Sequence, residues 1–215
     1  MKSIKNGILF DLDGTLWDAG EGVVRSWNYV LEKEGYVKRF TVKEMKGYMG
    51  LPMDEIGRRG FASEHLSEKE MMNILEKCMN NENEYLRLHG GVLYPHLEEV
   101  LDVLHKEYFL AVVSNCQSGY IEAFLEYHRL EKYFDDRECF GSTGLLKDKN
   151  ISLVAERNDL EDLIYIGDVQ GDLDAADLAG YRFVHASYGY GTVNRKTEYI
   201  TDLTQLQGIA KNMLH

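Results

Sequence analysis

The stretch ILFDLDGTLWD, residues 8–18, decides the fold of this chain. An apolar run ends in two carboxylates one residue apart, Asp11 and Asp13, and Gly14 follows them directly. A short apolar run closed by a glycine predicts a buried strand, here from Ile8 to Asp11, that ends in a turn. The stretch therefore predicts a sheet whose first strand delivers acidic side chains to its carboxyl end.

After this stretch the pattern changes to helical spacing. Apolar residues recur at helical intervals in EGVVRSWNYVLEKEG, residues 21–35, and a long helix is predicted over residues 67–88. Ser67 and Glu70 stand in the spacing of a capping box at the start of that helix. No strand pattern occurs in residues 17–88, so we expect this part of the chain to be all-helical.

From Gly90 and Gly91 onward, apolar strand patterns alternate with helical ones. Strands are predicted at FLAVVSN (109–115), ECFG (138–141), LIYIGD (163–168) and YRFVHAS (181–187). Buried runs that alternate with helices are typical of a parallel sheet covered on both faces. We expect the α/β class: a doubly wound, Rossmann-like parallel sheet built from residues 1–16 and 91–215, with a small all-helical cap domain inserted at 17–90.

The bulk properties exclude several classes of partner. The chain has 215 residues and a formal net charge of −12, which argues against a nucleic-acid polymer or an anionic membrane. No apolar run approaches the roughly 18 residues of a membrane span, and MKSIKNGILF, residues 1–10, lacks the apolar stretch of a signal peptide. Three scattered cysteines without a CxxC pair fit a reducing compartment, so we expect a cytoplasmic protein.

Polar side chains stand at the ends of three predicted strands. Asp11 ends the first, Ser114 and Asn115 end the second, and Asp168 ends the LIYIGD strand. Ligands of such sheets bind outside the carboxyl ends of the strands. Lys147, in the loop after ECFG, is expected to join this group.

Several carboxylates in one place cannot all remain ionised without a cation. Hard oxygen ligands suit Mg²⁺, which keeps several waters and accepts phosphate oxygens from a substrate. We expect Asp11 and Asp168 to be direct ligands. Asp172 follows in GDVQGD, one turn into the next helix, and is expected to orient the ligands around the metal.

The two carboxylates of the first motif are expected to have different chemical roles. Asp11 is placed to attack phosphorus as a nucleophile and form an aspartyl-phosphate. Because Gly14 turns the chain, Asp13 can reach the leaving-group oxygen as general acid and later serve as general base for water. We expect Thr15 to hydrogen-bond Asp13 and hold it in place.

The phosphoryl group of a substrate needs donors that balance its charge. We expect Ser114, Asn115 and Lys147 to hold its oxygens, together with the backbone N–H groups near Leu12 and Asn115.

The sequence resembles the haloacid dehalogenase (HAD) superfamily of phosphohydrolases in four motifs. These are DLDGT at 11–15, VVSN at 112–115, Lys147, and GDVQGD at 167–172. The helical insertion is similar to the family's C1-type cap, as in its phosphoglycolate phosphatase and β-phosphoglucomutase-like branch. The resemblance implies the same roles for the aspartates and adds the backbone carbonyl of Asp13 as a ligand of Mg²⁺.

One motif departs from the family pattern. The family's lysine is usually followed by proline, whereas this chain reads LLKDKN, so Lys149 stays open as an alternative to Lys147. The cap also carries more basic than acidic residues from Tyr36 to Arg59. Either a basic face over an anionic substrate or an ordinary solvated surface would account for this, and we favour the second. The loop at residues 49–52 could line the site.

We therefore predict a phosphatase that hydrolyses a small phosphomonoester with Mg²⁺ and acts as a monomer or homodimer. A phosphosugar mutase of the β-phosphoglucomutase type is the alternative, because it would share every core residue. A phospho-Asp signalling domain is a more distant alternative, since it needs neither Asp13 as an acid nor an inserted cap.

Overall fold

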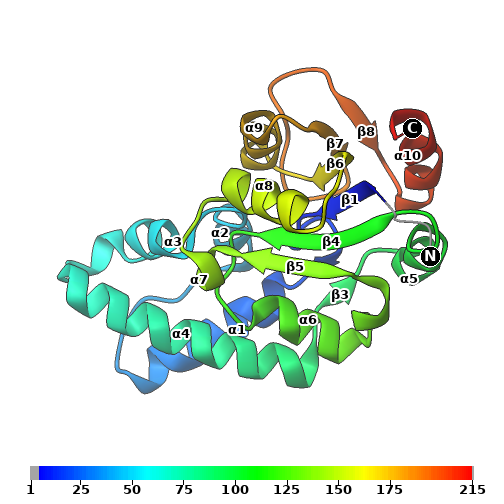
Figure 1. Cartoon of the computed structure of the whole chain (residues 1–215). Helices are drawn as coiled ribbons and strands as arrows, with labels where there is room; N and C mark the ends of the chain where they lie inside the picture. The colour runs from blue at the N-terminus through cyan, green and yellow to red at the C-terminus, as the bar shows by residue number, and fades with distance from the viewer. Residues whose placement is uncertain (1–4, 215) are drawn as a thin grey trace.

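The structure is a computed structural model that describes residues 5–214, so residues 1–4 and 215 of the predicted core lie outside the described part. Its centre is a six-stranded sheet in the order β5-β4-β1-β6-β7-β8, paired in parallel throughout (Figure 1). The strands are β1 (Asn6–Phe10), β4 (Phe109–Ser114), β5 (Asp136–Cys139), β6 (Asp162–Gly167), β7 (Arg182–Ala186) and β8 (Glu198–Ile200). The predicted α/β class with a parallel sheet is confirmed.

Helices cover both faces of the sheet. Side chains alternate between the faces of a strand, so Leu9 packs in one core cluster while Ile8 and Phe10 pack in the other. The cluster around Leu9 includes α8 (Lys147–Arg157) and α9 (Gln170–Ala179). The opposite cluster includes α5 (Leu97–Leu104), α6 (Tyr120–His128) and α10 (Leu206–Met213). This two-sided covering is the doubly wound arrangement expected from the sequence.

The remaining short helices lie in the connections of the core. They are η2 (Glu131–Tyr133), α7 (Phe140–Thr143) and η3 (Leu203–Gln205). No helix within residues 5–214 is long and apolar enough to cross a bilayer.

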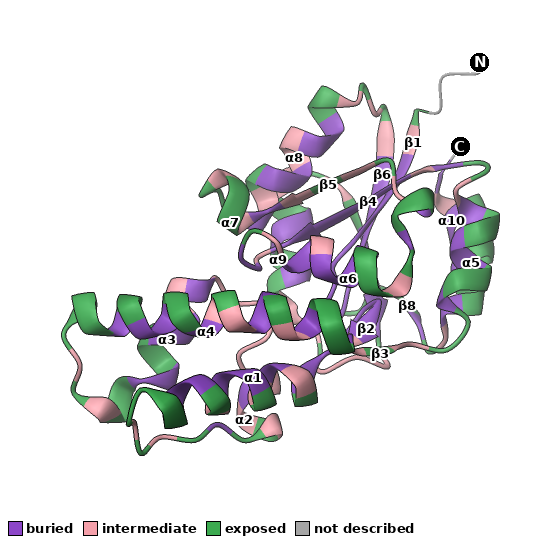
Figure 2. Ribbon diagram, turned by 90° about the horizontal axis from the view of Figure 1, so that it is seen from below, coloured by how far each residue is buried: buried purple, intermediate pink, exposed green. Residues whose placement is uncertain are grey.

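A helical segment between the first two core strands forms a separate lobe beside the sheet (Figure 2). It consists of α1 (Gly20–Lys33), α2 (Val42–Lys46), α3 (Met53–Gly60), η1 (Ala62–Glu64) and α4 (Glu68–His89). The buried sides of α1 and α4 face each other. The capping box of α4 is confirmed, because the Ser67 N–H donates to the Glu70 carboxylate and the Ser67 hydroxyl accepts from the Glu70 N–H. The proposed cap boundaries, 17 and 90, stay a prediction.

The expectation of an all-helical segment is wrong at its first residues. Strand β2 (Trp17–Asp18) pairs antiparallel with β3 (Val92–Leu93), so the two chain crossings between the lobes lie side by side. Two-residue strands are too short to produce a detectable alternation of apolar and polar residues. The edge strand β8 was not predicted for the same reason. Strand β5 begins two residues before the predicted segment, because its charged residues conceal it.

Gly14 makes the turn that follows β1. Its φ angle is +81°, and a Cβ atom there would lie 2.3 Å from Asp168 Oδ2. Left-handed backbone is costly for residues other than glycine, and this contact adds a steric clash. The turn is therefore closed against the end of β6 and tolerates no side chain.

Replacement of Gly14 by alanine tests this packing. Gly35 has nearly the same φ, +80°, but no atom lies within 4 Å of its Cβ position, so Gly35→Ala is a matched control. We expect Gly35→Ala to cost roughly 1–2 kcal/mol of unfolding free energy from backbone strain alone. Gly14→Ala is expected to cost clearly more in urea unfolding of the metal-free protein. Equal losses in the two variants would contradict the clash with Asp168.

Candidate functional site

The carboxyl ends of β1, β4 and β6 converge on one site. Asp11 follows β1, Ser114 ends β4, and Asp168 follows β6, and all three side chains are buried. The parallel pairing of β1 with both neighbouring strands is what places them together. The structure thus gathers residues that are far apart in the sequence, as the strand-end argument expected.

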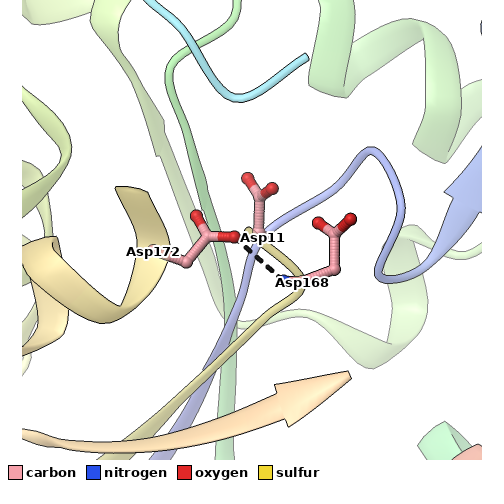
Figure 3. Close-up of side chains that lie close together, drawn as sticks. All are labelled: Asp11, Asp168 and Asp172. Carbon is pink, nitrogen blue, oxygen red and sulfur yellow. Dashed lines mark hydrogen bonds between the residues drawn. The ribbon is translucent and has the colours of Figure 1, made fainter. Parts of the chain in front are cut away.

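Three carboxylates form a compact acidic cluster. One oxygen each of Asp11, Asp168 and Asp172 lies within 4.8 Å of the others. Figure 3 shows them arriving from β1, from the loop after β6 and from the first turn of α9, with their carboxylates directed to the same side. Among the described residues, this is the group of acidic side chains whose geometry suits a metal ion.

Asp168 and Asp172 are held differently within the cluster. Asp168 Oδ2 accepts the Tyr190 N–H at 2.6 Å, whereas Asp168 Oδ1 is buried without a hydrogen-bond partner. A buried carboxylate oxygen without a partner is costly, and a divalent cation is the partner that would compensate it. Asp172 Oδ2 accepts the N–H groups of Asp168 and Val169 at 2.9 and 3.0 Å, so it fixes the loop that carries Asp168.

Lys147 belongs to the cluster, but it is the first residue of α8 rather than a loop residue, which corrects the prediction. The helix begins there because Leu146 has extended backbone. The Lys147 ammonium is buried and donates to Asp11 Oδ1 at 2.9 Å and to Asp172. Lys149 has a largely exposed side chain that pairs with Asp148. The lysine at the site is therefore Lys147.

Burial and crowding shift the pKa of these groups. Burial first, and then the charge of Asp172, raise the pKa of Asp11 to about 6, although Lys147 opposes the shift. Burial with the charges of Asp172 and Asp11 raises the pKa of Asp168 to about 8. Burial acts to lower the pKa of Lys147, but Asp11 and Asp172 raise it well above its usual value. The metal-free cluster therefore retains protons that exposed carboxylates would release.

Asp13 faces a different environment from Asp11. Its Oδ1 accepts the Tyr120 hydroxyl at 2.9 Å, and its side chain lines a cavity between the two lobes. Burial and then the charge of Asp11 raise the pKa of Asp13 well above its usual value, which Tyr120 partly opposes. Asp13 therefore holds its proton to higher pH than an exposed aspartate would.

The expected hydrogen bond from Thr15 to Asp13 is absent, and Tyr120 takes that place. The Thr15 hydroxyl is buried without a hydrogen-bond partner. Its N–H instead closes a turn on the Leu12 carbonyl at 3.2 Å, and its carbonyl accepts the Tyr188 hydroxyl at 2.8 Å. Thr15 thus supports the loop through its backbone.

The cavity between the lobes has a volume of about 30 Å³, enough for about two water molecules. Its core side includes Asp13, Ser114, Asn115, Cys116, Gln117 and Tyr120, and its cap side is mainly apolar. The cap loop at residues 49–51 lines it, and Asn115 Nδ2 donates to the Gly50 carbonyl at 2.9 Å. The helical lobe thus lies directly over the strand ends.

The basic residues of the cap do not face this cavity. Three of them pair with acidic residues of the same segment: Lys38 with Glu44, Arg58 with Asp54 and Arg59 with Glu55. Exposed pairs of this kind contribute little energy. The structure agrees with the solvated-surface interpretation of the basic segment.

Sequence reasoning missed Tyr120, Gln117 and Glu82, which also line the cavity. Glu82 had a detectable signal. It continues the buried positions of α4 that include Cys78 and Leu86, at intervals of four residues. A charged residue in such a stripe indicates a specific partner or function. Tyr120 and Gln117 look like ordinary residues at a helix start, so nothing in the sequence distinguished them.

Comparisons with known proteins agree with this geometry. A sequence model of the family described as haloacid dehalogenase-like hydrolase matches residues 8–186. A phosphoglycolate phosphatase of Aliivibrio fischeri is 28% identical over 193 residues, covering 85% of this chain and 84% of that protein. One from Vibrio cholerae is 27% identical and covers 94% of each chain.

Solved structures share the fold. A protein from Haemophilus somnus described as a predicted phosphoglycolate phosphatase superposes with a TM-score of 0.82 at 23% identity, over 97% of this chain and 99% of that one. A haloacid dehalogenase-like hydrolase from Streptococcus pneumoniae gives 0.79 at 22% identity, over 97% and 99%. Together with the family match over most of the chain and the buried aspartates at the strand ends, these likenesses lead to one conclusion. The chain belongs to the haloacid dehalogenase-like hydrolase family and is a phosphatase of that family.

Proposed function

We propose that this phosphatase hydrolyses a small phosphomonoester with Mg²⁺ through an aspartyl-phosphate on Asp11, with Asp13 as general acid and base. One observation carries the proposal. Two carboxyl groups of the same loop have separate surroundings, since Asp11 accepts from the Lys147 ammonium and Asp13 from the Tyr120 hydroxyl. Paired carboxyl groups in contrasting environments are typical of an acid–base division of roles.

The acidic cluster supports a site for Mg²⁺. Asp11, Asp168 and the backbone carbonyl of Asp13 would hold the ion, and Asp172 would orient Asp168 through the loop that it fixes. The partnerless Asp168 Oδ1 is the observation that fits a cation there. When bound, the ion supplies positive charge that balances the phosphoryl oxygens.

In the first step an oxygen of Asp11 attacks phosphorus, and the bond from phosphorus to the leaving-group oxygen breaks. Asp13 gives its proton to that oxygen, which leaves as an alcohol. The raised pKa of Asp13 favours this role, because a carboxyl with a raised pKa holds its proton to higher pH. Ser114 and Lys147, both buried at the site, would hold the phosphoryl oxygens together with the Asn115 N–H.

In the second step water attacks the aspartyl-phosphate. Asp13, now ionised, accepts a proton from the water, the bond from phosphorus to Asp11 breaks, and phosphate leaves with Asp11 restored. The helical cap, proposed at residues 17–90, would exclude bulk water during the first step.

The alternatives have less support in the cavity. A phosphosugar mutase must accommodate a second phosphate, yet no lysine, arginine or histidine of the described residues lines this cavity. A signalling domain would have no use for Asp13 and its bond from Tyr120. Phosphoglycolate, the substrate named for the relatives, is one candidate among small phosphoesters. The cytoplasmic location and a monomeric or homodimeric state stay predictions.

Replacing the two aspartates tests the division of roles. We expect Asp11→Asn to abolish Mg²⁺-dependent release of phosphate from p-nitrophenyl phosphate, because no phosphoenzyme can form. Asp13→Asn is expected to lower kcat roughly 10²–10⁴-fold, the range for loss of a general acid or base. Asp102→Asn, on the exposed face of α5, is the control. Substantial turnover by Asp11→Asn with intact folding would refute the covalent mechanism.

Tyr120→Phe tests the environment of Asp13. The lost hydrogen bond had lowered the pKa of Asp13, so the pKa rises and Asp13 keeps its proton to higher pH. We expect the basic limb of the profile of kcat/KM against pH to move upward. Tyr127→Phe, at an exposed position of the same helix, serves as control. A limb that stays in place would mean that Asp13 is not the titrating acid.

Metal binding should change how stability depends on pH. Asp11 and Asp168 have pKa values of about 6 and 8 in the folded protein, above the value near 4 of unfolded carboxyls. The native state therefore binds more protons, and in EDTA its unfolding free energy falls as pH rises from about 4 to 8. Mg²⁺ binds the ionised carboxylates, so the Tm increment from Mg²⁺ over EDTA should grow from pH 5 to pH 8.

Each tenfold gain in Mg²⁺ affinity corresponds to about 1.4 kcal/mol, or roughly 3–6 °C in Tm for a chain of this size. Calorimetry or a dye-based melting assay would measure the increment. Asp168→Asn should reduce it. An increment that is constant across this pH range would place the ion elsewhere.

A further inference from the structure

Glu82 is a buried carboxyl group that the proposed mechanism does not use. It lies on α4 of the cap, is 4% exposed, and lines the same cavity as Asp13. The Trp27 indole N–H donates to Glu82 Oε2. The charge of Glu82 acts on Asp13, so the two carboxyl groups are close enough to interact. Glu82 thus shares a cavity with the carboxyl group that is proposed to protonate the leaving group.

No cation compensates Glu82 in this cavity. Among the described residues, its lining contains no lysine, arginine or histidine. The buried ammonium of Lys147 is bound to Asp11 and Asp172. Lys46, on the cap, pairs with Asp18. The cavity therefore combines an apolar cap wall with two acidic groups and no positive charge of its own.

The Glu82 carboxylate can accept further hydrogen bonds besides the one from the Trp27 indole N–H. A carboxylate accepts up to about four hydrogen bonds, and a neutral indole donor compensates a buried charge less well than a cation does. Burial raises the pKa of Glu82 to about 7, partly offset by Trp27 and Gln117. A buried acid on an apolar helix face is costly, so a role in packing alone explains it poorly.

We propose that Glu82 selects the substrate of this phosphatase: the leaving group is a small alcohol that carries a hydrogen-bond donor, best an ammonium and next a hydroxyl, and a leaving group with a carboxylate is disfavoured. This inference rests on the proposed phosphomonoester hydrolysis. The small volume of the cavity, about 30 Å³, favours a small leaving group. Its methylene groups would contact the apolar cap residues, such as Met49 and Ile56.

Charge complementarity gives the reason for this order. An ammonium would form a charge-assisted hydrogen bond with the ionised Glu82 and would favour that ionised form, because an opposite charge lowers the pKa of a carboxyl. A carboxylate would meet a like charge wherever Glu82 is ionised, above its pKa of about 7, and no cation lines the cavity to offset this repulsion. A site built around an acceptor also disfavours an analogue that lacks the donor.

Four phosphomonoesters with two-carbon leaving groups test the inference with little change of size: 2-aminoethyl phosphate, 2-hydroxyethyl phosphate, ethyl phosphate and 2-phosphoglycolate. We would measure kcat/KM for each with Mg²⁺. The expected order is that in which they are named, with at least about tenfold between the first and the last. The wild-type series alone tests the order, so it does not depend on the folding of a variant.

Two glutamates on the same helix supply the variant and its control. Glu82→Gln keeps the shape and removes the charge, so it should lower the preference for 2-aminoethyl over ethyl phosphate about tenfold and raise relative activity on 2-phosphoglycolate. Glu84 is exposed, and Glu84→Gln should leave both ratios unchanged. A ratio that is the same in Glu82→Gln and wild type would overturn the role of Glu82.

The outcomes separate this inference from the function on which it rests. No release of phosphate from any of the four esters or from p-nitrophenyl phosphate would refute the proposed hydrolysis itself. Turnover of p-nitrophenyl phosphate with no preference among the four, or with 2-phosphoglycolate as the best, would overturn the inference about Glu82 and leave the hydrolysis standing. Turnover of p-nitrophenyl phosphate alone would equally contradict the proposed leaving group.

Discussion

Negative charge buried at one edge of the sheet is the constraint on which the rest of the structure depends. Asp11, Asp13, Asp168 and Asp172 all lie there, at most 8% exposed. Isolated charges are not stable in such surroundings, so each carboxyl group needs compensation. Lys147 supplies one buried positive charge, and the backbone N–H groups around Asp172 supply oriented dipoles. The rest of the buried negative charge is neutralised by protons that the carboxyl groups retain and by the proposed cation.

The same constraint explains the shape of the surrounding backbone. Gly14 and Gly189 both pass so close to Asp168 that a Cβ atom at either position would lie within 2.6 Å of its side chain. The backbone of the segments around Gly14 and Gly189 therefore packs directly against the Asp168 carboxylate. Such a close approach excludes water from the cluster and maintains the raised pKa of Asp168, whose largest cause is burial.

The parts that the sequence predicted are those determined by strong local patterns. The apolar run at residues 8–10 and the apolar runs of β4 and β6 have few interpretations, and strand ends in a parallel sheet converge by geometry. Lys147 was correctly predicted to join the strand-end residues, but it was wrongly predicted to lie in a loop. The exact start of a helix depends on where the backbone changes from extended to helical, here at Leu146. The pattern LLKDKN carries no capping residue that would fix the start.

The parts that escaped prediction depend on contacts between residues that are far apart in the sequence. The bond from Tyr120 to Asp13 joins residues 107 positions apart, and no local pattern specifies it. Thr15 was assigned that role because it is near Asp13 in sequence, whereas its hydroxyl has no partner. Glu82 was detectable in principle, but its meaning depends on what faces α4, which only the docked cap reveals.

The short β2–β3 ribbon has a mechanical consequence. Both chain crossings into the helical lobe run through it, and they are hydrogen-bonded to each other. Two separate linkers would let the lobe twist and slide as well as tilt. The ribbon ties the two crossings together, and the packing of α4 against α6 holds the lobe to the core at a second place. The hydrogen bond from Asn115 to the Gly50 carbonyl adds a contact directly over the strand ends, so the position of the lobe there does not depend on the ribbon alone.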